Sequence, residues 1–280
     1  SNPRYLHCYN NLITQARILG RITTVNGQWN RGRNSCEFAG YPNRYKIEAD
    51  VLKKFGYESM EQFRNWRWFK AYGGGPIVDL GSHQIDIYNW FLQAQPKSVM
   101  ASGGLDYWTE KSEGRQWYDT VQALFVYDTD KGPVRAFYQT ITTNSSNGYF
   151  ETFMGDEGTL VISEAAGRGD LYHELGAPDW EKWVSLGIIE KPKAETYKPK
   201  KDAVLDVRET VAPPKYNLPV EMKDPYHKPH LENFFNAIKG KEKLNCPAEV
   251  GYESAATVLK VNEAVEAGKS LEYKPEEFKV

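Results

Sequence analysis

Cysteine is scarce in this chain, and the spacing of the few cysteines excludes the sites that they usually build. There are three, Cys8, Cys36 and Cys246, among 280 residues, and no two of them form a Cys-x-x-Cys pair. Disulfide frameworks and structural zinc sites both need clustered cysteines. The sequence therefore argues against either of them.

Long apolar runs and a strong net charge are missing as well. No stretch approaches the roughly 20 apolar residues that a membrane-spanning helix requires. The formal net charge is −2, so there is no basic surface to indicate nucleic acid or an anionic membrane as a partner. With 40% hydrophobic and 26% charged residues, the composition is that of a folded globular protein.

Two kinds of periodicity divide the chain into helices and strands. Apolar residues recur at helical spacing over four segments: 4–18, 76–93, about 225–239 and 247–267. Strand-like patterns are found over six segments: 22–30, 98–108, 119–128, 132–143, 149–156 and 158–164. Most of these strands follow one another without a helix between them, and such strands pair antiparallel. The sequence therefore predicts an α+β fold, with a large mixed, mostly antiparallel open sheet and helices on one face.

We expect a single domain over residues 1–280 with a loop-rich excursion at about 165–220. Prolines and charged stretches break the patterns in this excursion, and one short helix near 180–184 is expected there. The helix at 225–239 should bury an apolar stripe formed by Leu231, Phe234, Phe235 and Ile238. The sheet face opposite the helices needs a cover, and pairing with a second copy of the chain is the simplest one.

The segment after the triple glycine at 73–75 carries the pattern that is most informative about chemistry. If a helix starts at Pro76, Asp79, His83 and Asp86 follow at spacings of four and three, which places them on one helical face. An imidazole titrates near neutral pH and can accept a proton from a hydroxyl. Asp86 can orient its ring, and Asp79 can bind the hydroxyl or share in the proton transfer. This face is therefore a candidate catalytic site.

Two other interpretations of the same three residues remain open. The aspartates could simply favour the N-terminal half of the helix, and His83 could be a buried histidine with satisfied hydrogen bonds. A metal site formed by Asp79, His83 and Asp86 lacks a fourth ligand in the sequence, so no metal is expected.

The residues just upstream and the glycines support either a ligand site or tight packing. Arg67 and Lys70 can hydrogen-bond substrate oxygens beside a wall formed by Trp66 or Trp68, or the cluster can be an aromatic plug beneath the glycine loop. The triple glycine permits backbone angles and ligand approaches that other residues forbid. Gly81 lies within the helix, where glycine costs about 1 kcal/mol relative to alanine, so it indicates a close approach by backbone or ligand.

The motif GGGPIVDLGSHQIDIYNWFL at 73–92 resembles the central motif of the Gfo/Idh/MocA family, the relatives of glucose-fructose oxidoreductase and inositol dehydrogenase. Three further segments extend the resemblance: residues 1–32, FMGDEGTLVIS at 153–163, and the closing segment 230–269. Together they cover most of the chain outside the excursion.

The resemblance implies a two-domain oxidoreductase in which an N-terminal Rossmann domain precedes an α/β domain whose open sheet often mediates oligomers. Asp79 and His83 match the family's Asp-x-x-x-His pair, the catalytic residues that face the nicotinamide. The implied reaction is reversible oxidation of a sugar or cyclitol hydroxyl with NAD or NADP. Trp66, Arg67 and Lys70 become candidates for substrate binding, Asp86 for orienting His83, and Gly74 and Gly75 for contact with the cofactor.

One signature of the family is missing. No Gly-x-Gly-x-x-Gly nucleotide loop is found in the sequence. The family's catalytic lysine lies in a Glu-Lys-Pro motif of the nucleotide domain. Glu190-Lys191-Pro192 has the same three residues but lies after the predicted strands, so we treat the match as a coincidence. We therefore expect the substrate-binding and catalytic domain of a longer enzyme, inactive without its Rossmann domain and with no cofactor bound to it alone. A homo-oligomer through the sheet face is expected. The alternatives are an NAD-dependent glycosidase of the same superfamily and a non-catalytic oligomerisation or ligand-binding module.

Overall fold

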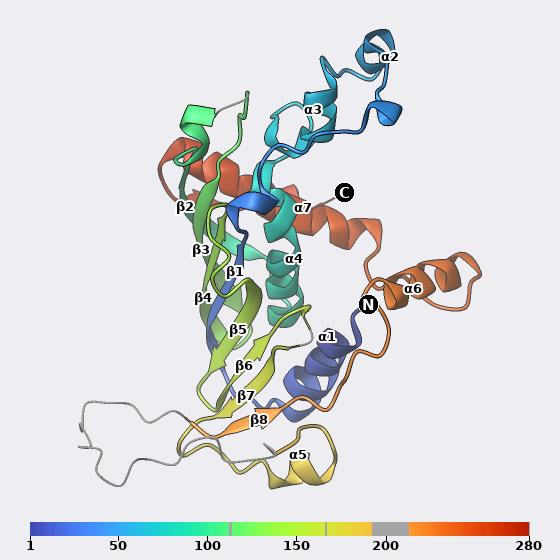
Figure 1. Cartoon of the computed structure of the whole chain (residues 1–280). Helices are drawn as coiled ribbons and strands as arrows, with labels where there is room; N and C mark the ends of the chain where they lie inside the picture. Colours follow the sequence, from blue (N-terminus) through green and yellow to red (C-terminus); the bar gives the residue numbers. More distant parts are fainter. Residues whose placement is uncertain (112–113, 166, 192–212, 280) are drawn as a thin grey trace, which may run out of the picture. The chain divides into compact units, whose positions relative to one another are not determined.

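The computed structural model describes residues 1–111, 114–165, 167–191 and 213–279 (Figure 1). The chain forms two compact units. Unit 1 combines Ser1–Val25 with Glu151–Asn245, and unit 2 combines Asn26–Phe150 with Cys246–Val280. The assignment of one domain to residues 1–280 stays a prediction.

The strands form one nine-stranded sheet in the order β8-β7-β6-β5-β1-β4-β3-β2-β9. Their bounds are β1 Ile22–Asn30, β2 Pro96–Gly104, β3 Thr120–Thr129, β4 Gly132–Ile141, β5 Tyr149–Gly155, β6 Gly158–Ile162, β7 Gly169–His173, β8 Lys215–Asn217 and β9 Leu271–Glu272. The β2–β3, β3–β4, β5–β6, β6–β7 and β7–β8 pairs are all antiparallel. The predicted α+β class, with a mostly antiparallel open sheet, is confirmed.

The helices are α1 Pro3–His7, α2 Ala49–Lys54, α3 Met60–Arg64, α4 Gly75–Leu92, α5 Glu181–Ser185, α6 Lys228–Ile238 and α7 Ala248–Ala267. None of the described helices is long and apolar enough to cross a membrane.

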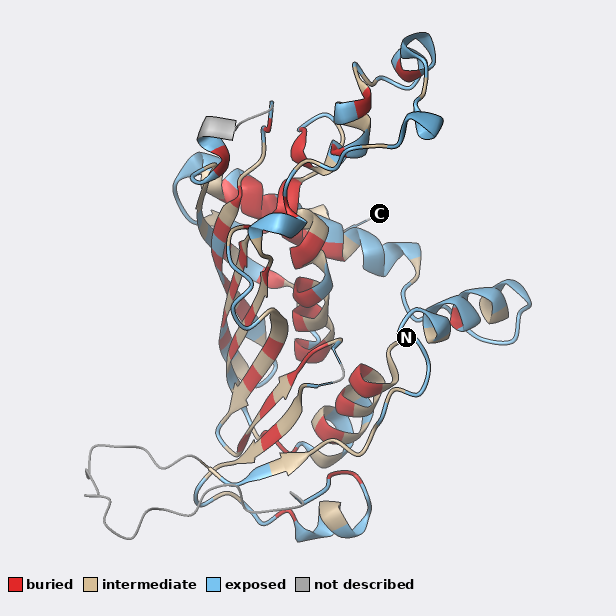
Figure 2. Cartoon of the chain, in the orientation of Figure 1, coloured by how far each residue is buried: buried red, intermediate tan, exposed pale blue. Residues whose placement is uncertain are grey.

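In unit 2, α4 packs on the inner face of β4, and α7 packs against α4 and β2. Strict alternation along β3 and β4 puts every second side chain on this inner face, and buried residues recur along the strands (Figure 2). The large buried apolar residues there are Val121, Phe125, Tyr127, Val134 and Tyr138. Gly81 lets α4 approach the sheet closely, because a Cβ at this position would lie 3.0 Å from the Tyr138 ring. The predicted close approach is present at this glycine, but a tyrosine side chain makes it, and neither backbone nor a ligand.

The outer face of the same strands carries an apolar row. Met100 pairs with Leu124, and Leu124 pairs with Phe137, so the three side chains lie next to one another across β2, β3 and β4. Met100 is 50% exposed and Leu124 is 47% exposed. This is the sheet face for which the sequence analysis expects a cover.

In unit 1, the predicted helix at 4–18 has two parts. The short α1 continues into a π-helix over Cys8–Ala16, which ends where Arg17 takes left-handed backbone angles. Hydrogen bonds in a π-helix run from residue i to i+5, so its side chains do not follow the spacing of an α-helix. Tyr5 in α1 and Cys8 and Leu12 in the π-helix are buried.

Two expectations for residues beyond 165 need correction. The excursion contains two strands that the sequence analysis did not predict, β7 and β8, besides the expected short helix, α5. Residues 192–212 of the excursion lie outside the described part of the chain. The stripe expected to be buried on α6 is instead exposed by 45–68%, because no described residue covers it: Leu231, Phe234, Phe235 and Ile238.

Candidate active site

The turn before α4 fixes the start of the helix that carries the predicted catalytic residues. Gly75 has a φ of +77°, and a Cβ at this position would lie 2.7 Å from the Cβ of Trp117. The Trp117 indole N–H donates to the Gly73 carbonyl, and Asn262 Nδ2 on α7 donates to the Gly74 carbonyl at 2.7 Å. The protein's own packing therefore accounts for glycine here, and contact of Gly74 and Gly75 with a cofactor stays a prediction.

Asp79, His83 and Asp86 lie on α4 as the spacing predicts, and they differ in exposure. His83 is exposed, whereas Asp79 and Asp86 are half-buried. The alternative in which His83 is a buried histidine is therefore wrong.

Arg67 joins the upstream cluster to this helical face. It lies in a short 3-10 helix at 66–68, and its Nε lies 3.0 Å from Asp79 Oδ2. Its guanidinium carbon also lies 5.2 Å from the centroid of the Trp66 ring. The Asp79 carboxylate thus has a cationic partner, and the hydrogen bond fixes its orientation.

Asp86 lies one helical turn beyond His83, at the contact of α4 with α7. Ser254 Oγ on α7 donates to Asp86 Oδ1 at 2.5 Å. Burial raises the pKa of the Asp86 carboxyl, while the Ser254 hydrogen bond and the charge of His83 act in the opposite direction. Asp86 is therefore held in place by Ser254 and also interacts electrostatically with His83.

Two strands contribute aromatic residues beside His83 that the sequence analysis did not assign to the site. The ring centroids of Trp29 on β1 and His83 are 5.4 Å apart with an interplanar angle of 58°. Tyr149 on β5 stacks on Trp29 at 4.5 Å and 20°, and the Arg31 guanidinium lies 5.4 Å from the Trp29 ring. Strand alternation alone cannot tell a core position from one that faces an exposed helix residue.

The other residues just upstream of the triple glycine fit either of the two predicted roles, a substrate-binding wall or an aromatic plug. Trp66 is 39% exposed and can form a wall, whereas Trp68 is buried and belongs to a small core with Cys36, Phe69 and Trp108. Lys70 Nζ lies 2.7 Å from Glu266 Oε1 on α7, so its ammonium group already has a partner. Binding of substrate by Trp66, Arg67 and Lys70 stays a prediction.

Beneath this cluster, Arg115 fills the space between three aromatic rings. Its guanidinium carbon lies 4.2–4.3 Å from the ring centroids of Phe38, Trp68 and Trp108. Guanidinium groups at this distance are attracted to the ring faces. Arg115 thereby packs against Trp68, the residue that follows Arg67 in the 3-10 helix.

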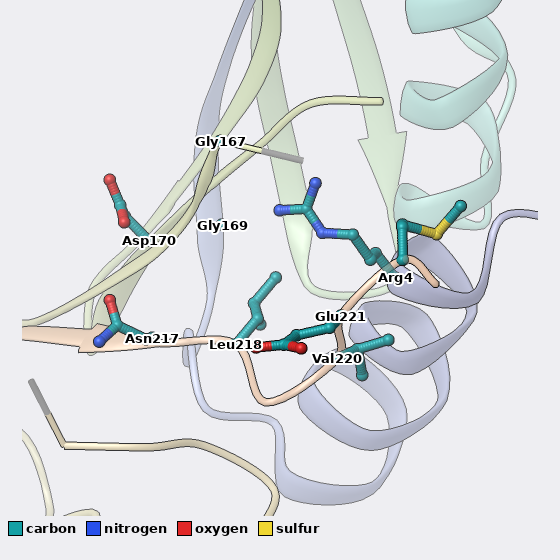
Figure 3. Close-up of a pocket in the computed structure, with 9 residues that line it drawn as sticks. Arg4, Gly167, Gly169, Asp170, Asn217, Leu218, Val220 and Glu221 are labelled. Carbon is teal, nitrogen blue, oxygen red and sulfur yellow. The ribbon is translucent and has the colours of Figure 1, made fainter. Parts of the chain in front are cut away.

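A pocket in unit 1 contains none of the predicted site residues. Its volume is about 410 Å³, and its lining includes Arg4, Asp170, Asn217 and Glu221 (Figure 3). The buried Arg4 guanidinium donates to the carbonyls of Ser163, Ala165 and Arg168, which fixes the loop after β6. Among the described residues, no group of three or more His, Cys, Asp or Glu side chains could hold a metal ion.

A family model and a curated protein are similar to this chain in sequence. The family model described as "Oxidoreductase family, C-terminal alpha/beta domain" matches residues 12–273. YteT of Bacillus subtilis (strain 168), assigned to the oxidoreductases, is 33% identical over 57 residues, which is 20% of this chain and 13% of YteT.

Solved structures share the fold at low sequence identity. Levoglucosan dehydrogenase in complex with NADH and L-sorbose has a TM-score of 0.62 and 12% identity over 97% of this chain. The WlbA dehydrogenase of Bordetella pertussis, in complex with NADH and UDP-GlcNAcA, has a TM-score of 0.57 and 13% identity over 98% of the chain. Aldose-aldose oxidoreductase of Caulobacter crescentus has a TM-score of 0.59 and 12% identity over 97% of the chain.

This chain spans 61–64% of the length of those three structures. The match of the family model over nearly the whole chain, together with the shared fold, establishes the relationship. The chain belongs to the Gfo/Idh/MocA oxidoreductase family, and its residues 12–273 match the family's C-terminal α/β domain.

Proposed function

We propose that this chain is the substrate-binding and catalytic domain of an NAD(P)-dependent oxidoreductase that acts on a hydroxyl of a sugar or cyclitol. The observation that carries the proposal is the exposed His83 on α4, one turn from an Asp79 carboxylate held by Arg67. Support for the substrate class comes from relatives solved with sugars and NADH.

The chemistry of these side chains fits the oxidation of a carbinol. Oxidation turns the carbinol carbon into a carbonyl carbon, and a bound nicotinamide cofactor would supply the acceptor for the hydride that this carbon loses. His83 accepts the hydroxyl proton as the carbonyl forms, and Asp79 accepts a hydrogen bond from a neighbouring hydroxyl of the substrate, which orients the reacting carbon. The negative charge of Asp86 favours the imidazolium that results. Proton and hydride together account for the two electrons and two hydrogens that the alcohol loses.

The chain needs a further domain to hold the nucleotide under this proposal. It contains no Gly-x-Gly-x-x-Gly loop, and close contacts with Val78 and Trp117 account for the glycines at 74 and 75. We infer that the chain alone binds the cofactor poorly and does not turn over substrate.

We also propose that the apolar row of Met100, Leu124 and Phe137 pairs with a second copy of the chain. An exposed apolar row on a sheet face is costly in water and is typical of an interface. A symmetric dimer covers both copies of the row with one contact.

The direct test of the catalytic assignment uses the protein with its nucleotide domain. Reduced-cofactor absorbance is followed over a panel of sugars and cyclitols for wild type, His83→Ala and the control His173→Ala. We expect His83→Ala to lower kcat/KM by about 10²–10⁴-fold, as is typical for loss of a general base, and His173→Ala to leave it unchanged. Wild-type rates in His83→Ala would end the assignment. Release of free sugar from an aryl glycoside without net cofactor reduction would instead indicate a glycosidase.

A further inference from the structure

We propose that Trp29 is the positioning residue of His83, and that it works as the centre of a fixed group with Tyr149 and Arg31. The effect of Trp29 on catalysis rests on the proposed function. Its effect on the orientation of the His83 ring does not, and it can be measured without turnover.

The contact between the two rings selects one orientation of the imidazole. His83 is exposed on α4, and an exposed side chain ordinarily samples several rotamers. The Trp29 ring lies 5.4 Å from the imidazole at an interplanar angle of 58°, a separation and tilt that aromatic pairs favour. Rotation of His83 about χ1 would lose this contact.

Trp29 is itself held more firmly than a lone surface indole. Tyr149 stacks on it at 4.5 Å, and Arg31 lies 5.4 Å from its ring centroid. Thr140 Oγ1 donates to the Trp29 carbonyl at 3.1 Å. The backbone N–H of Asn30 donates to the Gly148 carbonyl at 2.9 Å, which holds the residue before Tyr149 beside β1.

The helix beneath His83 is fixed to the same sheet. Tyr138 on β4 donates to Oε1 of Gln84, the residue after His83, at 2.9 Å, and Tyr88 donates to the Phe137 carbonyl at 2.9 Å. The backbone segments that carry His83 and Trp29 are therefore both held by hydrogen bonds to the sheet. Because a general base must lie within about 2.6–3.2 Å of the proton it accepts, the orientation of His83 controls its efficiency.

The structural part is tested by NMR on this chain, with the His83 ring signals assigned by their loss in His83→Ala. Nearby aromatic rings displace the ring-proton shifts of His83. In Trp29→Ala these shifts should move toward those of a free histidine, and in Trp29→Phe they should move only part of the way. The control Trp183→Ala, which removes a tryptophan from α5, should leave them unchanged.

Unchanged His83 shifts in a folded Trp29→Ala protein would overturn the inference. If Trp29→Ala does not fold, Trp29→Phe and Tyr149→Ala decide the question, since each alters the group from a different side. Wild-type His83 shifts in both would likewise overturn it.

In the enzyme with its nucleotide domain, Trp29→Ala should lower kcat with little change in KM, and Trp29→Phe should restore part of kcat. A loss confined to KM would contradict a positioning role. The two proposals fail separately: full turnover in His83→Ala removes the proposed function, whereas unchanged NMR shifts remove only the role of Trp29.

Discussion

At the residue scale, the burial of Asp86 makes the stability of the fold depend on pH. Burial raises the pKa of its carboxyl above the ordinary value of 3.8, against the opposing effect of the Ser254 hydrogen bond. For an acid whose pKa is higher in the folded state than in the unfolded state, the charged form costs stability. That cost is absent below the unfolded pKa and is fully present above the raised folded pKa.

We therefore predict that Asp86→Asn increases the free energy of unfolding at pH 7, because asparagine keeps an acceptor for Ser254 and carries no charge. The gain over wild type should shrink as the pH falls through the raised pKa toward 3.8. Urea unfolding at several pH values between about 4 and 8 measures it. A variant less stable than wild type at pH 7 would show that the Asp86 charge stabilises the fold.

The spacing of Asp79, His83 and Asp86 was enough to place them on one helical face, because helix geometry is local. Their partners were harder to predict. Arg67 lies 12 residues before Asp79, on the other side of the turn that precedes α4, and Ser254 reaches Asp86 from a helix 168 residues away. No local pattern encodes contacts of this kind.

At the scale of elements, the start of α4 depends on a residue without a side chain. Gly75 combines left-handed backbone angles with close contact to Trp117. Gly56 has a similar φ of +82° but no neighbour within 4 Å of an added Cβ, so it provides a matched control.

We predict that Gly75→Ala lowers the free energy of unfolding by about 2–4 kcal/mol, through backbone strain and overlap with Trp117. Gly56→Ala should cost about 1–2 kcal/mol from strain alone. Chemical denaturation of the two variants gives the difference between them. Equal losses would mean that Trp117 moves aside freely and does not fix the turn.

Helices and strands with a strong hydrophobic periodicity were predicted with nearly correct bounds. Short strands whose conformation depends on pairing with neighbouring strands were not predicted. The β1 strand has the predicted bounds, and α4 starts within one residue of the expected position. The short strands β7 and β8 have three to five residues and no clear alternation, so their pairing in the sheet decides their conformation. The apolar face of α6 predicts an amphipathic helix correctly, but amphipathicity does not say what covers that face.

At the scale of the whole molecule, the outer sheet face determines the expected assembly. Met100, Leu124 and Phe137 form a row on adjacent strands, which makes a compact patch from residues far apart in the sequence. The strand pattern predicted an open face that needs a cover, and the register of the strands was needed to define the row.

We predict that the chain self-associates and that Leu124→Lys shifts it toward monomer, because a charge at the centre of the row cannot be buried without a partner. Sedimentation equilibrium measures the change. Leu175→Lys is the control, since Leu175 is 86% exposed and lies outside the row. Equal association of both variants and wild type would exclude this face as the interface.

The measurement that tests the proposed reaction most directly follows the hydrogen that leaves the substrate. The protein with its nucleotide domain is given an active sugar or cyclitol that carries deuterium on the carbon of the reacting hydroxyl. The reduced nicotinamide is then analysed by mass spectrometry. We predict one deuterium in the cofactor for each carbonyl formed. Product formation without deuterium in the cofactor, or without reduced cofactor at all, would contradict hydride transfer in this protein.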